Sequence, residues 1–106
     1  MPDLKWTDSE KKIARRVFEA ALAAELAEVM SEFKQKAAGV STADEMWALE
    51  TYLGTRRREI EAKYDFRYSQ LLLVFGALRR EGRVQPADLR GLSDEKIGSI
   101  CRMAAL

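Results

Sequence analysis

Residues 7–38 read TDSEKKIARRVFEAALAAELAEVMSEFKQKAA, and this stretch carries the strongest structural signal in the chain. Thr7 and Glu10 have the spacing of a capping box, in which a threonine hydroxyl and a glutamate carboxylate satisfy free amides of a first helical turn. No Pro or Gly interrupts the stretch, and apolar residues recur at spacings of three to five, at Ile13, Val17, Leu22, Leu26, Val29, Met30 and Phe33. The pattern predicts an amphipathic helix over residues 8–38, roughly 45 Å long at 1.5 Å per residue.

A tight connection and a second long helix are expected next. Gly39 can take the left-handed conformation that ends many helices, and Thr42 can cap the helix that follows. Apolar residues then recur at helical spacing, at Met46, Leu49, Leu53, Ile60, Tyr64, Leu71, Phe75 and Leu78. We therefore expect a long helix over residues 43–81, antiparallel to the first, with a bend at Gly54 or within residues 65–69.

The residue pattern after Gly82 predicts shorter helices. Pro86 suits the first position of a helical turn, and Ser93 can cap a last helix, so short C-terminal helices are expected over residues 86–106. Residues 1–106 then form a single all-α domain, which consists of a long antiparallel helical hairpin plus a small C-terminal helical bundle.

The composition agrees with a folded helical protein. Apolar residues make up 47% of the chain, and the formal net charge is only +1, so no overall field attracts nucleic acid or anionic lipid. The longest uncharged apolar run, residues 71–78, is too short to cross a bilayer, and residues 1–10 lack the apolar core of a signal peptide. A single cysteine, Cys101, suits a reducing compartment. We expect a cytoplasmic protein without direct membrane insertion.

The sequence offers little material for catalysis. It contains no His, which is the commonest general acid or base near neutral pH and the commonest metal ligand. Only Arg102 and backbone dipoles could activate Cys101, so we read this cysteine as a buried or half-buried helix residue. The glycines form no phosphate-binding loop. We expect no enzyme activity, no catalytic residue, no metal site and no cofactor.

The apolar residues near the hairpin tip need a cover. The roughly 20 residues after Pro86 are too few to reach them, and a second copy of the same hairpin is the simplest partner. We predict a homodimer with an interface at Val29, Met30, Phe33, Met46, Leu49 and Leu53. The alternative is that these side chains cover one another within a single hairpin.

A mixed aromatic and basic surface is predicted on the second long helix. Its residues follow one another at helical spacing: Trp47, Glu50, Thr51, Gly54, Arg57 and Arg58. Trp and Arg are enriched at binding hot spots, so this surface is a candidate partner-binding patch. Alternatively, Trp47 belongs to the apolar seam of the dimer.

Nucleic-acid binding is a further hypothesis, distinct from protein binding. Arg56, Arg57 and Arg58 are adjacent, and Arg79 and Arg80 add to the basic character of the same stretch. Three consecutive helical residues point in directions about 100° apart, and acidic neighbours repel phosphate, so we expect no nucleic-acid partner. If the hypothesis held, binding would weaken steeply with salt.

The segment from Trp47 to Arg67 has the spacing W-x-L-x-x-x-L-x-x-x-R-x-x-I-x-x-K-Y-D-x-R, and Ser69, Val74 and Phe75 follow it. This long ungapped pattern resembles the fluorescence recovery proteins of cyanobacteria. The resemblance implies a small, dimeric, all-helical regulator that binds the photoactivated orange carotenoid protein or a related carotenoid-binding domain. It also implies that the protein accelerates return to the inactive orange form and so ends photoprotective quenching, without covalent chemistry.

The resemblance carries two binding residues onto this chain, Trp47 and Arg57. Between them the family has a His and an Asp, whereas this sequence has Glu50 and Thr51. A thylakoid association through the partner is a further expectation from the resemblance. The competing hypothesis is a dimeric helical adaptor of the same fold with an unrelated protein client.

Overall fold

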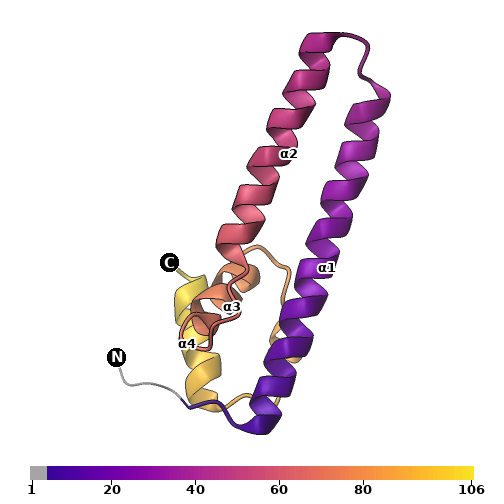
Figure 1. Ribbon diagram of the computed structural model, residues 1–106. Coiled ribbons are helices and arrows are strands. Elements are labelled where there is room, and N and C mark those ends of the chain that lie inside the picture. Colours follow the sequence, from indigo (N-terminus) through magenta and orange to yellow (C-terminus); the bar gives the residue numbers. More distant parts are fainter. Residues whose placement is uncertain (1–4) are drawn as a thin grey trace.

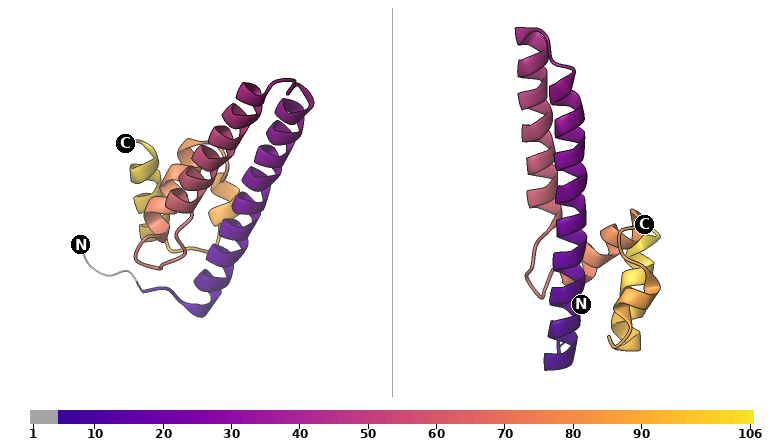
Figure 2. Two further views of the ribbon diagram at one scale, coloured as in Figure 1. Left: turned by 45° about the horizontal axis from the view of Figure 1, so that its top comes forward. Right: turned by 90° about the vertical axis from the view of Figure 1, so that its right-hand side faces the viewer.

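The protein is all-helical in the computed structural model, which describes residues 5–106. Residues 1–4 of the expected domain lie outside the described residues. The elements are α1 (Asp8–Ala38), α2 (Ala43–Lys63), α3 (Leu71–Arg80), the 3₁₀ helix η1 (Pro86–Leu89) and α4 (Asp94–Ala104). Helices α1 and α2 lie side by side as an antiparallel hairpin, and α3 and α4 stand beside the first half of α1 (Figures 1 and 2). The described chain measures 53 × 24 × 23 Å.

The predicted helix starts are confirmed. At α1 the backbone amide of Glu10 donates to Thr7 Oγ1 at 3.2 Å, and the amide of Thr7 donates to Glu10 Oε1 at 3.0 Å. At α2 the amide of Glu45 donates to Thr42 Oγ1 at 3.1 Å. The prediction of a left-handed Gly39 is wrong, because this residue has φ −90° and ψ −2° and its amide donates to the carbonyl of Lys36.

The expected single helix over residues 43–81 is wrong, because the chain leaves the helix after Lys63 and starts α3 only at Leu71. Tyr64 and Phe66 turn inward, and both rings pack edge-on against Phe18 of α1, with centroid distances of 5.4 and 4.9 Å. This burial of aromatic surface replaces about two turns of helix. The interruption falls where one of the two bends was expected, whereas α2 runs unbroken through Gly54.

The hydrophobic core lies at one end of the molecule. Its buried residues come from the first half of α1 and from α3, η1, α4 and their connections: Ala14, Val17, Phe18, Ala21, Leu71, Val74, Phe75, Leu78, Val84, Leu89, Leu92 and Ile100. We call residues 5–22 and 64–106 the base, and residues 26–59 the outer hairpin. No residue of the outer hairpin is buried. The molecule therefore joins a packed base to a long projection without a core of its own.

Helices α3 and α4 approach closely because of one glycine. A Cβ atom placed on Gly76 would lie 2.7 Å from Cβ of Met103, a distance that no real pair of such atoms tolerates. Cys101 also lies on α4, and it is exposed, so its reading as a buried or half-buried residue is wrong. None of the helices in residues 5–106 is long and apolar enough to cross a membrane.

Candidate partner-binding surfaces of the hairpin

Helix α2 presents one face to α1. The hydroxyl of Tyr52 donates to Glu32, and Lys36 lies 4.9 Å from the centroid of the Tyr52 ring. Near the base, Arg56 and Lys63 both reach a carboxylate of α1. These contacts define the inward direction of α2, and the other residues can be placed around the helix at about 100° per residue.

A continuous apolar face runs along one side of the hairpin, beside the line where the two helices meet. We define this face by Leu26, Val29, Met30 and Phe33 of α1 and by Met46, Leu53 and Ile60 of α2. Leu26, Val29, Leu53 and Ile60 line a hollow of about 400 Å³ on it. Met30 is 56% exposed and Met46 is 46% exposed, which is unusual for large apolar side chains.

Arg57 belongs to this apolar face. It lines the same hollow, together with Glu61, and its Nε donates to Glu61 Oε1 at 2.8 Å. The spacing from Met46 through Glu50 and Leu53 to Arg57 is four, three and four residues, so Glu50 falls on this line as well. Arg57 is 80% exposed, and its guanidinium is accessible beside the apolar surface.

The remaining residues of the predicted patch form a separate line, which we call the outer stripe: Trp47, Thr51, Gly54 and Arg58. The stripe lies about 100° around α2 from the apolar face and points away from α1. Trp47 is 57% exposed, and Thr51 Oγ1 donates to the carbonyl of Trp47 at 3.2 Å. A Cβ atom on Gly54 would lie 3.4 Å from Nη1 of Arg58, so the glycine leaves room for this guanidinium.

The structure thus divides both predicted sets of residues. The six patch residues separate into the outer stripe and a pair, Glu50 and Arg57, on the apolar face. Five of the six predicted interface residues share the apolar face, but Leu49 lies toward α1 and lines another hollow with Val40 and Tyr52. Sequence spacing alone did not separate these lines, because the six patch residues span only about 120° around the helix and the direction of α1 is not known from the sequence. The assignment of these surfaces to a partner stays a prediction.

An acidic residue that the sequence analysis passed over lies at the junction of the hairpin and the base. The side chain of Glu25 is only 1% exposed, although a glutamate in a polar helix is usually solvated. Lys63 Nζ lies 2.7 Å from Glu25 Oε1, and the Tyr64 hydroxyl donates to the same oxygen at 2.9 Å. Arg56 Nη2 lies 3.4 Å from Glu25 Oε2, and Arg83 Nε lies 3.3 Å from Oε1.

The carboxylate of Glu25 is therefore held in its charged form. Burial by itself raises the pKa of Glu25, but hydrogen bonds from Lys63 and Tyr64, with the nearby charges, lower it below its usual value. Burial and the neighbouring carboxylate raise the pKa of Tyr64. This cluster ties α1 to the end of α2 and to the segment after α3, and so sets how the hairpin leaves the base.

Within residues 5–106 no group of three or more His, Cys, Asp and Glu side chains is arranged to hold a metal ion. The surfaces described above offer shape, charge and apolar area, which are the requirements of protein recognition.

Comparisons with known proteins agree on one family. The family model described as photoprotection regulator fluorescence recovery protein matches residues 6–104. The fluorescence recovery protein of Synechocystis sp. PCC 6803 is 33% identical over 101 residues, which cover 95% of this chain and 93% of that protein. The solved structure of the Fremyella diplosiphon protein is similar at a TM-score of 0.92, with 29% identity, 96% of this chain covered and 100% of that one. The solved Synechocystis structure gives a TM-score of 0.92 with 32% identity and the same coverage.

Proposed function

This chain belongs to the fluorescence recovery protein family of photoprotection regulators, and we propose that it acts as a homodimer that binds a photoactivated orange carotenoid protein. The bound client returns faster to its inactive orange form, which ends photoprotective quenching. The action is non-enzymatic and needs no cofactor.

The proposal of a dimer rests on the outer hairpin, in which no residue is buried. None of residues 26–59 is buried, yet Met30, Phe33 and Met46 are large, apolar and exposed on one face. Full burial of such a side chain contributes about 1.5–3 kcal/mol. A two-fold axis against the apolar face would bury each of these side chains twice, once in each copy.

The client-binding surface follows from what this dimer leaves free. The outer stripe points away from α1 and from the apolar face, so Trp47 and Arg58 stay accessible in the dimer. Arg57 and Glu50 would lie at the edge of the interface, where the two copies meet. An indole and guanidinium groups together offer contact area and forked hydrogen bonding to carboxylates.

Acceleration of the client's return requires only state-dependent affinity. An intermediate arrangement lies between the photoactivated form and the inactive orange form of the client. A protein that binds this intermediate more tightly than the photoactivated form lowers the barrier to the return. No group on this chain has to form or break a bond. The absence of His from the sequence is compatible with this mechanism.

The test is the relaxation of a purified orange carotenoid protein in the dark after a light pulse, followed by absorbance with and without equimolar protein. We expect the protein to accelerate the red-to-orange step. Arg57→Leu should abolish the acceleration and leave the dimer intact, because leucine keeps the hollow apolar but cannot pair with a carboxylate. Arg90→Leu, an exposed residue of the base, is the matched control and should keep full activity.

Two residues that depart from the family pattern favour a second candidate function, that of an adaptor for another protein. Glu50 and Thr51 stand where the family resemblance places a His and an Asp, which moves the acidic group by one position. A dimeric helical adaptor with an unrelated client would show unchanged relaxation in the same assay while it remains dimeric. Full activity of Arg57→Leu would instead overturn only the assignment of that residue.

A further inference from the structure

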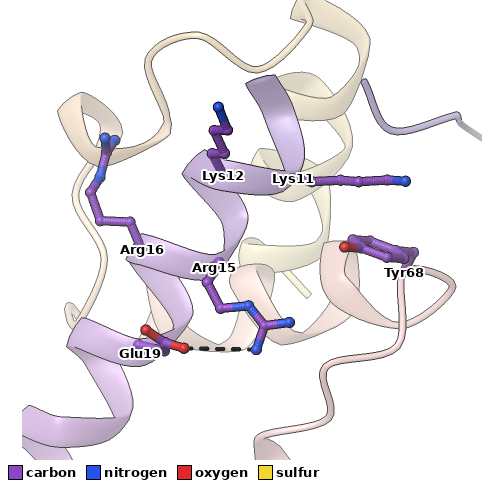
Figure 3. A pocket seen from close by; sticks show the side chains of 6 residues that line it. All are labelled: Lys11, Lys12, Arg15, Arg16, Glu19 and Tyr68. Atoms are coloured by element: carbon purple, nitrogen blue, oxygen red, sulfur yellow. Dashed lines mark ion pairs between the residues drawn. The ribbon is translucent and has the colours of Figure 1, made fainter. Parts of the chain in front are cut away.

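A basic surface lies on the base, at the end of α1 opposite the hairpin tip. It is formed by Lys11, Lys12, Arg15 and Arg16, which are all exposed and occupy the first turns of α1. We call these four residues the basic face. Together with Tyr68 and Glu19 they line an open hollow of about 520 Å³ (Figure 3). Lys11 and Met30 are about 28 Å apart along the helix axis, so the basic face is remote from the apolar face of the outer hairpin.

The positive charge of this face is only partly compensated. The single ion pair of its four residues within residues 5–106 joins Arg15 Nη1 to Glu19 Oε1 at 3.7 Å, and both side chains are more than half exposed. Exposed pairs of this kind contribute little. Lys12 and Arg16 form no ion pair with any carboxylate of the described residues. The face therefore concentrates positive charge in a chain whose net charge is only +1.

Two aromatic rings hold part of the basic face in place without neutralising it. The guanidinium of Arg15 lies 3.9 Å from the centroid of the Phe66 ring, and Lys11 Nζ lies 5.2 Å from that of Tyr68. Figure 3 shows Lys11 and Arg15 extending to the side of Tyr68, and Lys12 and Arg16 pointing in other directions around α1. Cation–π contacts restrict the side chains and leave their charge available to a ligand.

We propose that the basic face binds a compact cluster of carboxylates on a partner protein, as presented by one or two turns of an acidic helix. Lys11 and Arg15, and likewise Lys12 and Arg16, are about 6 Å apart along the axis of α1, which matches carboxylates four residues apart on a partner helix. Positive and negative surfaces of this size attract one another at long range and align on contact. This proposal does not rest on the client proposed for the hairpin.

The surroundings of the face favour a compact protein ligand over an extended polyanion or a lipid surface. Asp8 precedes the four cations along α1 and Glu19 follows them, so a nucleic acid lying along the helix would meet negative charge at both ends. The hollow has no exposed aliphatic side chain among its lining residues, whereas binding to a membrane surface relies on buried apolar area beside the positive charge.

The test uses a fluorescent peptide whose glutamates repeat at helical spacing, with binding followed by fluorescence anisotropy at low salt and at physiological salt. The variant Lys12→Glu/Arg16→Glu reverses the two cations that have neither an ion pair nor a cation–π contact among the described residues. We expect it to raise the dissociation constant about tenfold or more, and we expect wild-type binding to weaken as salt rises. The control Lys34→Glu/Arg90→Glu changes the net charge equally at exposed positions elsewhere, and its dissociation constant should stay within about twofold of wild type.

Three results would overturn the proposal. Equal weakening by both double variants would mean that net charge alone attracts the peptide. Tighter binding of wild type to phosphatidylglycerol vesicles or to a single-stranded oligonucleotide, lost in Lys12→Glu/Arg16→Glu, would assign the face to another class of ligand. If the double charge reversal disturbs the circular dichroism spectrum, Lys12→Gln/Arg16→Gln is measured in its place. Unchanged peptide binding in that variant would also contradict the assignment.

Discussion

Phe18 and Phe33 lie on the same helix, but Phe18 is 7% exposed in the base and Phe33 is 37% exposed in the outer hairpin. Helix α1 continues without interruption between them, so helix formation does not distinguish the two regions. The difference comes from what covers the helix: the base brings α3, η1 and α4 against α1, and the outer hairpin has only α2. Regular secondary structure therefore extends well beyond the part of the chain that can bury itself.

The largest expected effect separates the two regions by their packing. Phe75 is completely buried in the base, and Phe75→Ala should lower the free energy of unfolding by about 3–5 kcal/mol because it leaves a cavity. Phe33→Ala should change the free energy of unfolding of a single subunit by less than about 1 kcal/mol. Urea unfolding followed by far-UV circular dichroism measures both. Equal losses would mean that the outer hairpin is packed as tightly as the base.

The second prediction tests the proposed dimer interface on one side of the outer hairpin. Met46→Glu places a charge on the apolar face close to its symmetry mate, which should weaken the dimer by about 3 kcal/mol or more. Thr51→Glu introduces the same charge on the outer stripe and should leave the dimer intact. Light scattering at low micromolar concentration compares the two variants. A dimeric Met46→Glu protein would place the interface elsewhere.

The third prediction concerns acid, and it should affect the base. Glu10 is buried, its Oε2 accepts from the amide of Ser93 at 2.9 Å, and Lys96 Nζ lies 3.1 Å from its Oε1. Burial raises the pKa of Glu10, but hydrogen bonds from the amides of Thr7 and Ser93 and from Lys96 lower it to about 2. Because the folded pKa lies below the unfolded one, near 4.5, this stabilisation is complete above pH 4.5 and is lost as the pH falls toward 2.

The melting temperature of wild type should therefore fall steeply between about pH 4.5 and pH 2, and Glu10→Gln should show a flatter fall over the same window. At neutral pH the variant should be less stable by about 2 kcal/mol, because Lys96 remains buried without its charged partner. Differential scanning calorimetry over a pH series gives both quantities. The same slope in both proteins would exclude Glu10 as a source of the acid sensitivity.

The smallest effect should have opposite signs in the two regions. Gly76→Ala places a Cβ against Met103 and forces α3 from α4, so it should destabilise the base by about 1–3 kcal/mol. Gly54→Ala meets only the flexible end of Arg58 and removes a glycine from a helix interior, so it should stabilise α2 by up to about 1 kcal/mol. Thermal unfolding of both variants compares the signs. Destabilisation by Gly54→Ala would indicate a tighter environment than the hairpin offers.

Local signals in the sequence were sufficient for most of the fold. Thr7, Thr42 and Ser93 cap helices where their spacing predicted, and Pro86 begins η1. The break between α2 and α3 was located only as one of two bends, because no Pro or Gly marks it. Tyr64 fits the helical period of the preceding residues, but it ends the helix, and its ring packs on Phe18 of a distant segment.

The candidate surfaces were less predictable than the helices. The period of α2 groups the candidate residues, but only contacts with α1 fix the direction in which each one points, and they separate Arg57 from Arg58. Glu25 gave no signal at all, since its burial depends on cations that come from α2 and from the segment after α3. Residues that act through tertiary partners far along the chain are invisible to local periodicity.

The hydrogen bond from Ser93 to Glu10 also determines the order in which the molecule can be assembled. It closes a loop of 83 residues, whereas the two helices of the hairpin are joined by a short connection. Closure of long loops carries the larger entropic penalty and slows folding. On a ribosome, α1 and α2 can pair while α4 is still being synthesised, and the core of the base waits for Ile100. The contacts between α1 and α2 can therefore form earlier along the chain than the core of the base, which needs residues near the end of the chain.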